Sequence, residues 1–358
     1  MRVVIACPAV VEYDAVGNDV IEEYRCLKEE GIEAYIYAEK FDDSSSHLIS
    51  EDCLHLLKKK DTVLVYHHAI HWERGLELFK NAACRKVVKY HNITPEHFFL
   101  PYSSNIFKNC LLARKQTGEL LGAGIDLALF DSHFNALDFL SLGFPPERCR
   151  ILAPFNRIHE YEKIKSDISV LERLSDGKVN VLFTGRVAPN KGHRHILYTA
   201  YYYKLLFGNN VRFTIVGGKD FLLNGYYREL KELRGSLQID DIVEMTGTVS
   251  YEELKSYYLA SHIFLLMSEH EGFCVPVLEA QYFKLPIIAF ASSAVKETAG
   301  KNQLIYNSID YETFASSIHT LYNDPGARMY LADEGHKNFQ GYERDGLKNL
   351  FLSQMGEC

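Results

Sequence analysis

The sequence predicts an α/β fold made of two doubly wound parallel sheets, and three observations lead to this class. The chain has 358 residues, more than one typical hydrophobic core holds. Strand-like and helix-like segments alternate along it, a pattern typical of parallel sheets covered by helices on both faces. The alternation lapses over residues 156–178, a charged stretch ending in Ser175-Asp176-Gly177, which we interpret as a linker.

The first domain is predicted over residues 1–155. Its strands are expected at Val3–Cys7, Ala34–Ala38, Thr62–Tyr66, Lys86–Tyr90, Leu127–Asp131 and Cys149–Leu152. Helical patterns lie between these strands, for example at Val20–Glu30 and Phe134–Leu142.

The second domain is predicted over residues 179–331. Its strands are expected at Val179–Thr184, Arg212–Val216, Ile242–Met245, His262–Met267 and Pro286–Ala289, with helices at Arg194–Leu206, Asn224–Arg234 and Tyr251–Ala260. The last stretch, residues 332–358, is helical in pattern from about Asp333 to Leu352. Because doubly wound sheets bind ligands at the carboxyl ends of their strands, site residues are expected there.

The composition narrows the class of protein. Hydrophobic residues make up 47% and charged residues 24%, as in an ordinary soluble globular protein. The net charge of −8 argues against nucleic acid as a partner. No run of about 18 apolar residues predicts a membrane span, and the chain opens on a strand with no signal-peptide organisation. Eight scattered cysteines fit reduced thiols, so a cytoplasmic protein is expected and the Asn92 sequon is read as accidental.

The most informative segment is Ser268–Gln281. It follows an apolar run that reads as a buried strand, turns at a glycine, and places Pro276 where a helix begins. The N-terminus of a helix offers backbone N–H groups and a partial positive charge, which suit a phosphate. Glu271 in the turn and Glu279 about one helical turn inside the helix suit hydroxyl groups, such as those of a ribose and a hexose. The segment therefore predicts a site for a sugar attached to a nucleotide diphosphate.

A pair of basic residues follows another predicted strand. Arg186 comes directly after Gly185 at the carboxyl end of that strand, and Lys191 lies five residues later at the start of a helix. Cations at that position would stabilise the negative charge that develops on a diphosphate leaving group. The alternative is a solvated basic pair on the surface. The positive end of the helix dipole disfavours cations there, so we favour the anion-binding role.

Two residues of the first domain are candidates for ligand contact. Gly17 is expected in the loop after the first strand, just before the helix from Asn18, where a glycine lets the backbone approach a phosphate or a sugar closely. His91 follows the strand Lys86–Tyr90 and is therefore expected at the ligand-binding edge of the sheet. The alternative for His91 is a polar strand-end residue hydrogen-bonded to backbone.

These segments together resemble the retaining glycosyltransferases of family 4, which have the two-domain GT-B fold. Ser268–Gln281 resembles their E-x7-E signature, although Cys274 stands where many members have glycine. The strand–GR–x4–KG segment, the VG-G turn and the G-x-V turn of the family resemble Phe183–Gly192, Ile215–Gly218 and Thr246–Val249. Two further segments resemble a subgroup that builds bacterial surface polysaccharides, namely Asp14–Asp19 and Tyr90–Pro95.

The resemblance implies a role for each candidate. The two domains are expected to face each other across a cleft, with residues 332–358 crossing back onto the first domain. Glu271 is expected to hold hydroxyls of the donor sugar, Glu279 the ribose, and His91 the donor sugar. The expected catalytic residues are Glu271, His91, Arg186 and Lys191. The expected nucleotide-sugar-binding residues are Gly17, Gly185, Arg186, Lys191, Glu271, Gly272, Phe273, Cys274, Val275 and Glu279, where the backbone N–H groups of residues 273–275 serve the diphosphate.

The function implied is transfer of a hexose, with retention, from a nucleotide-diphosphate sugar to a hydroxyl of a polysaccharide or a lipid-linked oligosaccharide. Mannose from GDP-mannose is the first expectation, because the subgroup includes mannosyltransferases. The alternatives are a UDP-sugar-dependent transferase of the same family, a nucleotide-sugar epimerase with the same fold, and a non-catalytic subunit. A phosphorylase of the pyridoxal type lacks the lysine context it needs.

No metal or other cofactor is expected. His67, His68 and His71 form a histidine cluster, but the segment ends a strand, so a spacing of four residues does not put two of them on one helix face. Members of the family generally need no metal for the reaction. Gly122-Ala123-Gly124 precedes a strand and lacks a third glycine, so it is not a dinucleotide fingerprint. His193 and His195 are expected at the surface.

The stretch Phe98–Lys115 mixes aromatic, aliphatic and basic residues. It is compatible with an interfacial helix near a lipid-linked acceptor, which would give the protein a peripheral membrane contact. A core-facing helix with a solvated basic edge is the commoner explanation of such a stripe. Both interpretations are kept.

Overall fold

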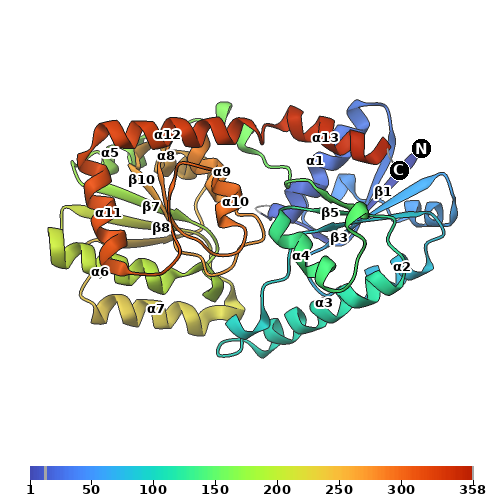
Figure 1. The fold of residues 1–358 in the computed structure, drawn as a ribbon, viewed down its shortest axis with the longest axis horizontal. Coiled ribbons are helices and arrows are strands. Elements are labelled where there is room, and N and C mark those ends of the chain that lie inside the picture. Colours follow the sequence, from blue (N-terminus) through green and yellow to red (C-terminus); the bar gives the residue numbers. More distant parts are fainter. Residues whose placement is uncertain (12–13, 357–358) are drawn as a thin grey trace. The chain divides into compact units, whose positions relative to one another are not determined.

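A computed structural model describes residues 1–11 and 14–356 and divides the chain into two compact units. Unit 1 comprises Met1–Glu96, Ile106–Arg157 and Tyr342–Cys358. Unit 2 comprises His97–Asn105 and Ile158–Gly341. Each unit has its own parallel sheet with helices on both of its faces (Figure 1).

The sheet of unit 1 has six parallel strands in the order β2-β1-β3-β4-β5-β6. The strands are β1 (Arg2–Val10), β2 (Glu33–Phe41), β3 (Thr62–His68), β4 (Arg85–Tyr90), β5 (Leu127–Phe130) and β6 (Cys149–Ile151). The strand order reverses between β1 and β3, so the connections after these two strands leave on opposite faces of the sheet. Such a topological switch point is where open α/β sheets bind ligands.

The helices of unit 1 are α1 (Ala15–Glu29), α2 (Glu73–Asn81), α3 (Ser104–Gly122), α4 (His133–Ser141) and α13 (Arg344–Gly356). α1 and α13 lie side by side on one face of the sheet, and α2 and α3 lie on the other (Figure 1). Arg344 joins the two helices of the first pair, because its guanidinium donates to the carboxylates of Glu22 at 2.8 Å and Glu29 at 2.6 Å.

The sheet of unit 2 also has six parallel strands, in the order β12-β11-β10-β7-β8-β9. They are β7 (Val179–Thr184), β8 (Val211–Val216), β9 (Val243–Gly247), β10 (Ile263–Leu266), β11 (Ile287–Phe290) and β12 (Leu304–Tyr306). Counted from the first strand of the unit, this is the strand order of the dinucleotide-binding Rossmann fold. Its switch point lies between β7 and β10.

The helices of unit 2 are α5 (Ile168–Leu174), α6 (His193–Phe207), α7 (Asn224–Ser236), α8 (Tyr251–Ala260), α9 (Val275–Tyr282), α10 (Val295–Ala299), α11 (Tyr311–Asn323) and α12 (Pro325–Gln340). α5, α8, α9 and α12 lie on one face of the sheet, and α6 and α7 lie on the other (Figure 1). Short 3-10 helices in the chain are η1 (Ser46–Leu48), η2 (Asp52–Lys58), η3 (Glu96–Phe98), η4 (Pro146–Arg148), η5 (Ile158–Glu162), η6 (Pro189–Lys191) and η7 (Phe221–Leu223).

The central strands β3, β5, β7 and β10 are buried on both faces, as parallel strands between two layers of helices are. All six residues of β7 and all four of β10 are buried, and these apolar runs are what made the strands recognisable in the sequence. Two doubly wound sheets are therefore confirmed. β12 was not expected, because its three residues are only partly buried and give a short apolar signal.

Three stretches differ from the expected organisation. Residues 158–174, expected as linker, form η5 and α5 and belong to unit 2, where Asp167 caps α5 and accepts from Val170 N at 3.1 Å. The C-terminal helical pattern is two helices, α12 in unit 2 and α13 in unit 1, separated at Gly341–Glu343. Residues 97–105, expected in the first domain, are part of unit 2, where the Tyr102 hydroxyl donates to Glu229 at 2.9 Å.

In the part of the chain that the structure describes, no helix has the length and apolarity needed to cross a membrane. α3, which contains most of the mixed aromatic and basic stretch, buries Ala113, Thr117 and Leu120. Leu111 and Leu112 of the same helix are exposed.

Candidate active site

In unit 2, three of the predicted turns pack on one another at the carboxyl ends of β7, β8 and β9. Gly217 N donates to Gly247 O at 3.0 Å, and Gly185 N donates to Val216 O at 2.9 Å. A Cβ atom added at Gly217 would lie 1.9 Å from Gly185 O, so only glycine lets these two turns approach so closely. The glycines of the sequence motifs therefore bring three loops together at one edge of the sheet.

Lys191 and Glu271 meet at the switch point of unit 2. Lys191 ends η6 after β7, and Glu271 lies in the loop after β10, the neighbouring strand. The Lys191 Nζ donates to Glu271 Oε2 at 2.7 Å. Gly192 makes this approach possible, because a Cβ atom there would lie 1.8 Å from Met267 O, at the end of β10. The structure thus joins two residues that were predicted from separate motifs.

The loop that carries Glu271 is held at both sides. Asn190 O accepts from Glu269 N at 2.8 Å, and Asn190 Nδ2 donates to His270 O at 3.1 Å. On the other side, Glu271 N donates to Ser293 Oγ at 2.7 Å. These bonds fix the position of the Glu271 carboxylate. The carboxylate is almost entirely buried, and Lys191 supplies the opposite charge that a buried carboxylate needs.

Cys274 precedes α9 with a φ of 83°, in the left-handed region. Glycine adopts this conformation at little cost, which explains why glycine would suit this position better than cysteine. The thiol is buried, and burial raises its pKa well above the ordinary value. Cys274 is therefore a packing residue in a neutral form. The next residue, Val275, opens α9, so its backbone N–H has no acceptor within the helix.

Glu279 is tied to two tyrosines. Its Oε2 accepts from the Tyr258 hydroxyl at 2.7 Å and its Oε1 from the Tyr161 hydroxyl at 3.1 Å. Burial raises the pKa of Glu279, and the two hydroxyl donors oppose that rise. Each carboxylate oxygen has more than one lone pair, so Glu279 can still accept from a ligand hydroxyl. Neither tyrosine was foreseen, and Tyr161 lies in the stretch that was read as linker.

Arg186 stands apart from these satisfied groups. It follows β7 and Gly185, its side chain is exposed, and no described residue is recorded as its hydrogen-bond or ion-pair partner. An exposed cation at the carboxyl end of a strand, with no internal partner, can bind an anion from solution.

In unit 1 the position of Gly17 differs from the expectation. It lies in the first turn of α1, whose N-cap Asp14 accepts from Gly17 N at 3.0 Å. A Cβ atom at Gly17 would lie 3.2 Å from Val11 O. Glycine therefore lets the start of α1 pack tightly on the end of β1, a structural reason for its presence that the sequence did not indicate.

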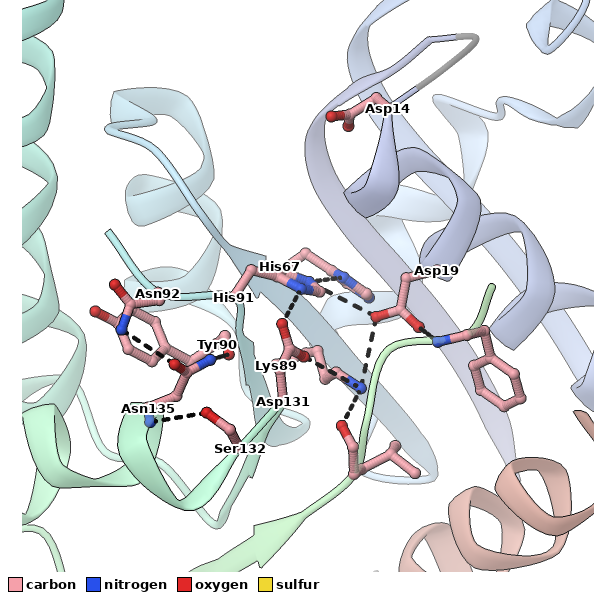
Figure 2. A network of polar contacts seen from close by, with 12 residues as sticks. Asp14, Asp19, His67, Lys89, Tyr90, His91, Asn92, Asp131, Ser132 and Asn135 are labelled. Atoms are coloured by element: carbon pink, nitrogen blue, oxygen red, sulfur yellow. Dashed lines mark hydrogen bonds and ion pairs between the residues drawn. The ribbon is translucent and has the colours of Figure 1, made fainter. Parts of the chain in front are cut away.

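His91 lies directly after β4, as expected, but its ring contacts side chains rather than backbone. Its Nδ1 is 3.0 Å from Asp131 Oδ2, and its Nε2 is 2.8 Å from His67 Nδ1 (Figure 2). His67, in turn, places its Nε2 3.0 Å from Glu23 Oε2. The alternative of a strand-end histidine whose ring is hydrogen-bonded to backbone is wrong, because the carboxylate of Asp131 and the ring of His67 take the two ring nitrogens.

A fully buried lysine completes this cluster. Lys89 Nζ donates to Leu152 O at 2.9 Å and lies 3.5 Å from Asp19 Oδ2, 3.8 Å from Asp131 Oδ1 and 4.0 Å from Glu23 Oε1. Burial lowers the pKa of Lys89, but the three carboxylates outweigh it and the pKa is raised. The sequence carried a signal that was missed, since a lysine inside an apolar parallel strand needs buried acids near it.

The same cluster contains residue types that can bind a metal ion. Among the described residues, Asp19, His67 and His91 each bring one ligand atom within 4.8 Å of the others. However, Lys89 already supplies a positive charge 3.5 Å from Asp19, and the two histidines use their facing nitrogens for a hydrogen bond. This set of groups fits an internal ion-pair network better than a bound cation.

Asn92 and three further histidines, His68, His193 and His195, take ordinary structural places. His68 Nε2 is 2.9 Å from Thr117 Oγ1 on the other side of β3, so it does not join His67. His193 is fully buried against Phe183, and its expected surface position is wrong. His195 is partly exposed and lies 3.3 Å from Glu269. The buried Asn92 side chain donates to Asn135 Oδ1 at 3.1 Å.

Residues 166–338 match the family model of glycosyl transferases group 1. A D-inositol 3-phosphate glycosyltransferase of Arthrobacter sp. (strain FB24) is 24% identical over 219 residues, which are 59% of this chain and 48% of that protein. The capsular polysaccharide biosynthesis glycosyltransferase CapM of Staphylococcus aureus is 22% identical over 217 residues, covering 54% of this chain and 53% of that protein.

Among solved structures, Anabaena Alr3699/HepE in complex with UDP and glucose superposes with a TM-score of 0.76 at 16% identity, over 100% of both chains. This likeness confirms the GT-B fold class. The matches to the first curated relatives span 33% to 48% of their lengths. The residues that match the family model lie in unit 2, and both curated relatives are glycosyltransferases by name.

Proposed function

We propose that this chain, as a group 1 glycosyltransferase, moves a hexose from a nucleotide-diphosphate sugar to a hydroxyl group of a polysaccharide or glycolipid acceptor. The observation that carries the proposal is the Lys191–Glu271 pair at the switch point of unit 2, together with the exposed Arg186 just after β7, a strand that borders this switch point. This is where a Rossmann-type sheet binds its nucleotide, and it combines cations for a diphosphate with a fixed carboxylate for hydroxyl groups.

In this proposal different residues of unit 2 contact different parts of the donor. Arg186 and Lys191 stabilise the negative charge that grows on the diphosphate as the glycosidic bond breaks, so they act most strongly in the transition state. The start of α9, with the backbone of Gly185, Gly272, Phe273, Cys274 and Val275, receives the phosphates. Glu271 orients the sugar hydroxyls and Glu279 the ribose hydroxyls.

The transfer is proposed to retain the configuration at the sugar carbon. The described site offers Glu271 already paired with Lys191 at 2.7 Å, which suits positioning better than nucleophilic attack. The acceptor hydroxyl therefore attacks from the face that the diphosphate leaves, and a diphosphate oxygen takes its proton. In unit 1, His91 is proposed to contact the donor sugar, and Gly17 to lie near the donor.

GDP-mannose is the first proposed donor, and a UDP-hexose is the alternative. One comparison favours the UDP-hexose. Alr3699/HepE was solved in complex with UDP-glucose, and that structure superposes on this chain with a TM-score of 0.73 at 16% identity. The name of CapM favours a polysaccharide acceptor. A cytoplasmic location, with a peripheral contact to the membrane through the exposed Leu111 and Leu112 of α3, completes the proposal.

No divalent cation is proposed, because side chains and the start of α9 supply the positive charge. Turnover in excess EDTA should then match turnover without it. Loss of turnover in EDTA that Mg²⁺ or Mn²⁺ restores would contradict this and would return attention to Asp19, His67 and His91.

The test of the proposed function is a panel of nucleotide sugars that includes GDP-mannose and UDP-glucose, with slow hydrolysis of the donor as the readout when no acceptor is known. A transferase releases free nucleotide diphosphate and a free sugar of the donor's own anomeric configuration. An epimerase instead converts the donor to its epimer, and a non-catalytic subunit leaves every donor intact. Either of these last two outcomes would overturn the proposal.

A further inference from the structure

A chain of three hydrogen bonds crosses unit 1 beside the switch point between β1 and β3. It runs from Glu23 Oε2 to His67 Nε2 at 3.0 Å, from His67 Nδ1 to His91 Nε2 at 2.8 Å, and from His91 Nδ1 to Asp131 Oδ2 at 3.0 Å. Every side chain in it is buried or nearly so. Figure 2 shows the part from His67 to Asp131.

The two ends of this chain decide how many protons it contains. Each hydrogen bond needs one proton, so three bonds need three protons. An ionised carboxylate only accepts hydrogen bonds, and each neutral imidazole carries a single N–H. Two neutral histidines between Glu23 and Asp131 thus supply two protons and leave one of the three contacts as a clash of lone pairs. The observed distances therefore require one additional proton.

All three hydrogen bonds are satisfied when the additional proton lies on any one of the four groups, Glu23, His67, His91 or Asp131. Two of these arrangements keep His67 neutral and Asp131 ionised. With the proton on His91, the imidazolium donates to both Asp131 and His67, and His67 donates to Glu23. With the proton on Glu23, the carboxyl group donates to His67, which donates to His91, which donates to Asp131. The net charge of the four groups is the same in both arrangements.

The surroundings favour retention of this proton. The titratable groups that face the chain are Asp19 of α1, Lys89 of β4 and the Cys7 thiol of β1, whose pKa burial raises so that it stays neutral. His68 points to the other side of β3. Asp19 balances Lys89, so without the additional proton the buried cluster would carry two uncompensated negative charges, which a protein interior disfavours.

The pKa directions agree with this count. Burial raises the pKa of Glu23 to about 7. Burial alone would lower the pKa of His91, but the Asp131 carboxylate outweighs burial, and the pKa of His91 is raised. Burial holds the pKa of His67 well below its ordinary value. Protonation of either Glu23 or His91, with a neutral His67, matches the two arrangements.

We propose that Glu23 and His67 are positioning residues for His91, and that the chain from Glu23 to Asp131 holds one shared proton that fixes the orientation and charge of the His91 ring. This inference rests on the proposed function, in which His91 contacts the donor sugar. Loss of the shared proton breaks one hydrogen bond to His91 or His67, so the ring loses its fixed orientation. Transfer then falls as pH rises, while nucleotide affinity is unchanged.

The test is Glu23→Gln. A glutamine amide has the same shape and can donate to His67 Nε2, so all three hydrogen bonds form with two neutral histidines and no additional proton. In the variant the orientation of the His91 ring therefore no longer depends on a proton that titrates. The limb of the kcat profile at high pH that is expected for the wild type should disappear, so that kcat of the variant at pH 8 stays near its value at pH 6.

The matched control is Glu77→Gln, an exposed carboxylate of α2 in the same unit, which should leave the profile unchanged. A second readout needs no turnover. In protein labelled with ¹⁵N at histidine, NMR spectra of the wild type should show the loss of the additional proton in one step as pH rises, and spectra of Glu23→Gln should lack that step.

Two results would overturn the inference: wild-type spectra in which His67 and His91 are both neutral while Glu23 and Asp131 are both ionised at pH 6–7, or a pH profile that Glu23→Gln leaves in place. If the variant fails to fold, the wild-type spectra alone decide. If no nucleotide sugar is turned over, the transferase proposal fails, and the proton count is still read from the spectra.

Discussion

At the switch point of unit 2, Arg186 is exposed and 21% of the Lys191 side chain is exposed to solvent. At the switch point of unit 1, the side chains of Lys89, Asp19 and Glu23 are fully buried. Both units therefore gather charges at the same topological position of a parallel sheet. In unit 1 the charged groups pair with one another inside the protein. In unit 2 part of the positive charge is left for a ligand.

The comparison teaches that a charged switch point is not by itself a binding site. A bound diphosphate must find cations whose partners it can replace or supplement, and Arg186 and Lys191 meet that condition. The buried carboxylates of unit 1 already pair with Lys89, and the role proposed for their cluster is to hold His91. Substitutions in the two regions should accordingly differ in kind, with loss of stability in unit 1 and loss of turnover in unit 2.

The largest effect is expected for Lys89→Met. Methionine matches the lysine stem in size but leaves three buried carboxylates without a cation, which should cost about 3–5 kcal/mol of unfolding free energy. Urea denaturation measures this. Lys86→Met on the same strand is the control, because Lys86 makes one part-buried hydrogen bond to Ala123 O and should matter far less. Equal stabilities of the two variants would contradict the account of the unit 1 cluster.

Glu271→Ala should lower kcat by on the order of 10²-fold, because the carboxylate positions the donor in the reacting geometry. Glu269→Ala tests the loop itself. Glu269 lies two residues away, its side chain is 41% exposed and it pairs with His195, so turnover should stay near normal. A Glu271 variant as active as the Glu269 variant would remove Glu271 from the site.

Glu279→Ala should weaken nucleotide binding more than it lowers kcat. It should also cost about 1–3 kcal/mol of stability, since the buried Tyr258 hydroxyl loses an acceptor. The double variant Tyr161→Phe, Tyr258→Phe separates the two effects, because it removes both donors and keeps the carboxylate. Calorimetry that shows unchanged nucleotide affinity in Glu279→Ala would refute the assignment of Glu279 to the ribose.

Much of this comparison could be anticipated from the sequence. The two sheets followed from apolar runs such as Val179–Thr184, because a strand buried on both faces needs only local composition to be recognised. Glu271 and Lys191 stood out through neighbouring glycines, and Gly192 is now seen to bring them together. Each of these signals lies within a few residues of the group it marks.

What was missed depends on pairs far apart in the chain. Glu23 and His67 are 44 residues apart, and Tyr161 and Glu279 are 118 residues apart, so no local pattern joins them. Lys89 read as one residue of a strand, and Tyr161 as part of a linker. In both cases the partner that explains the residue is supplied by the tertiary fold.

The most direct test of the difference between the two units is the affinity of UDP and GDP for the wild type and for Arg186→Ala, measured by calorimetry together with donor turnover. The exposed Arg186 has no recorded partner among the described residues, so its loss should leave the melting temperature unchanged. We expect weaker diphosphate binding and a loss of about 2–4 kcal/mol of transition-state stabilisation, as for one oxyanion donor. Unchanged diphosphate affinity together with normal turnover in Arg186→Ala would contradict the claim that unit 2 leaves its positive charge for the donor.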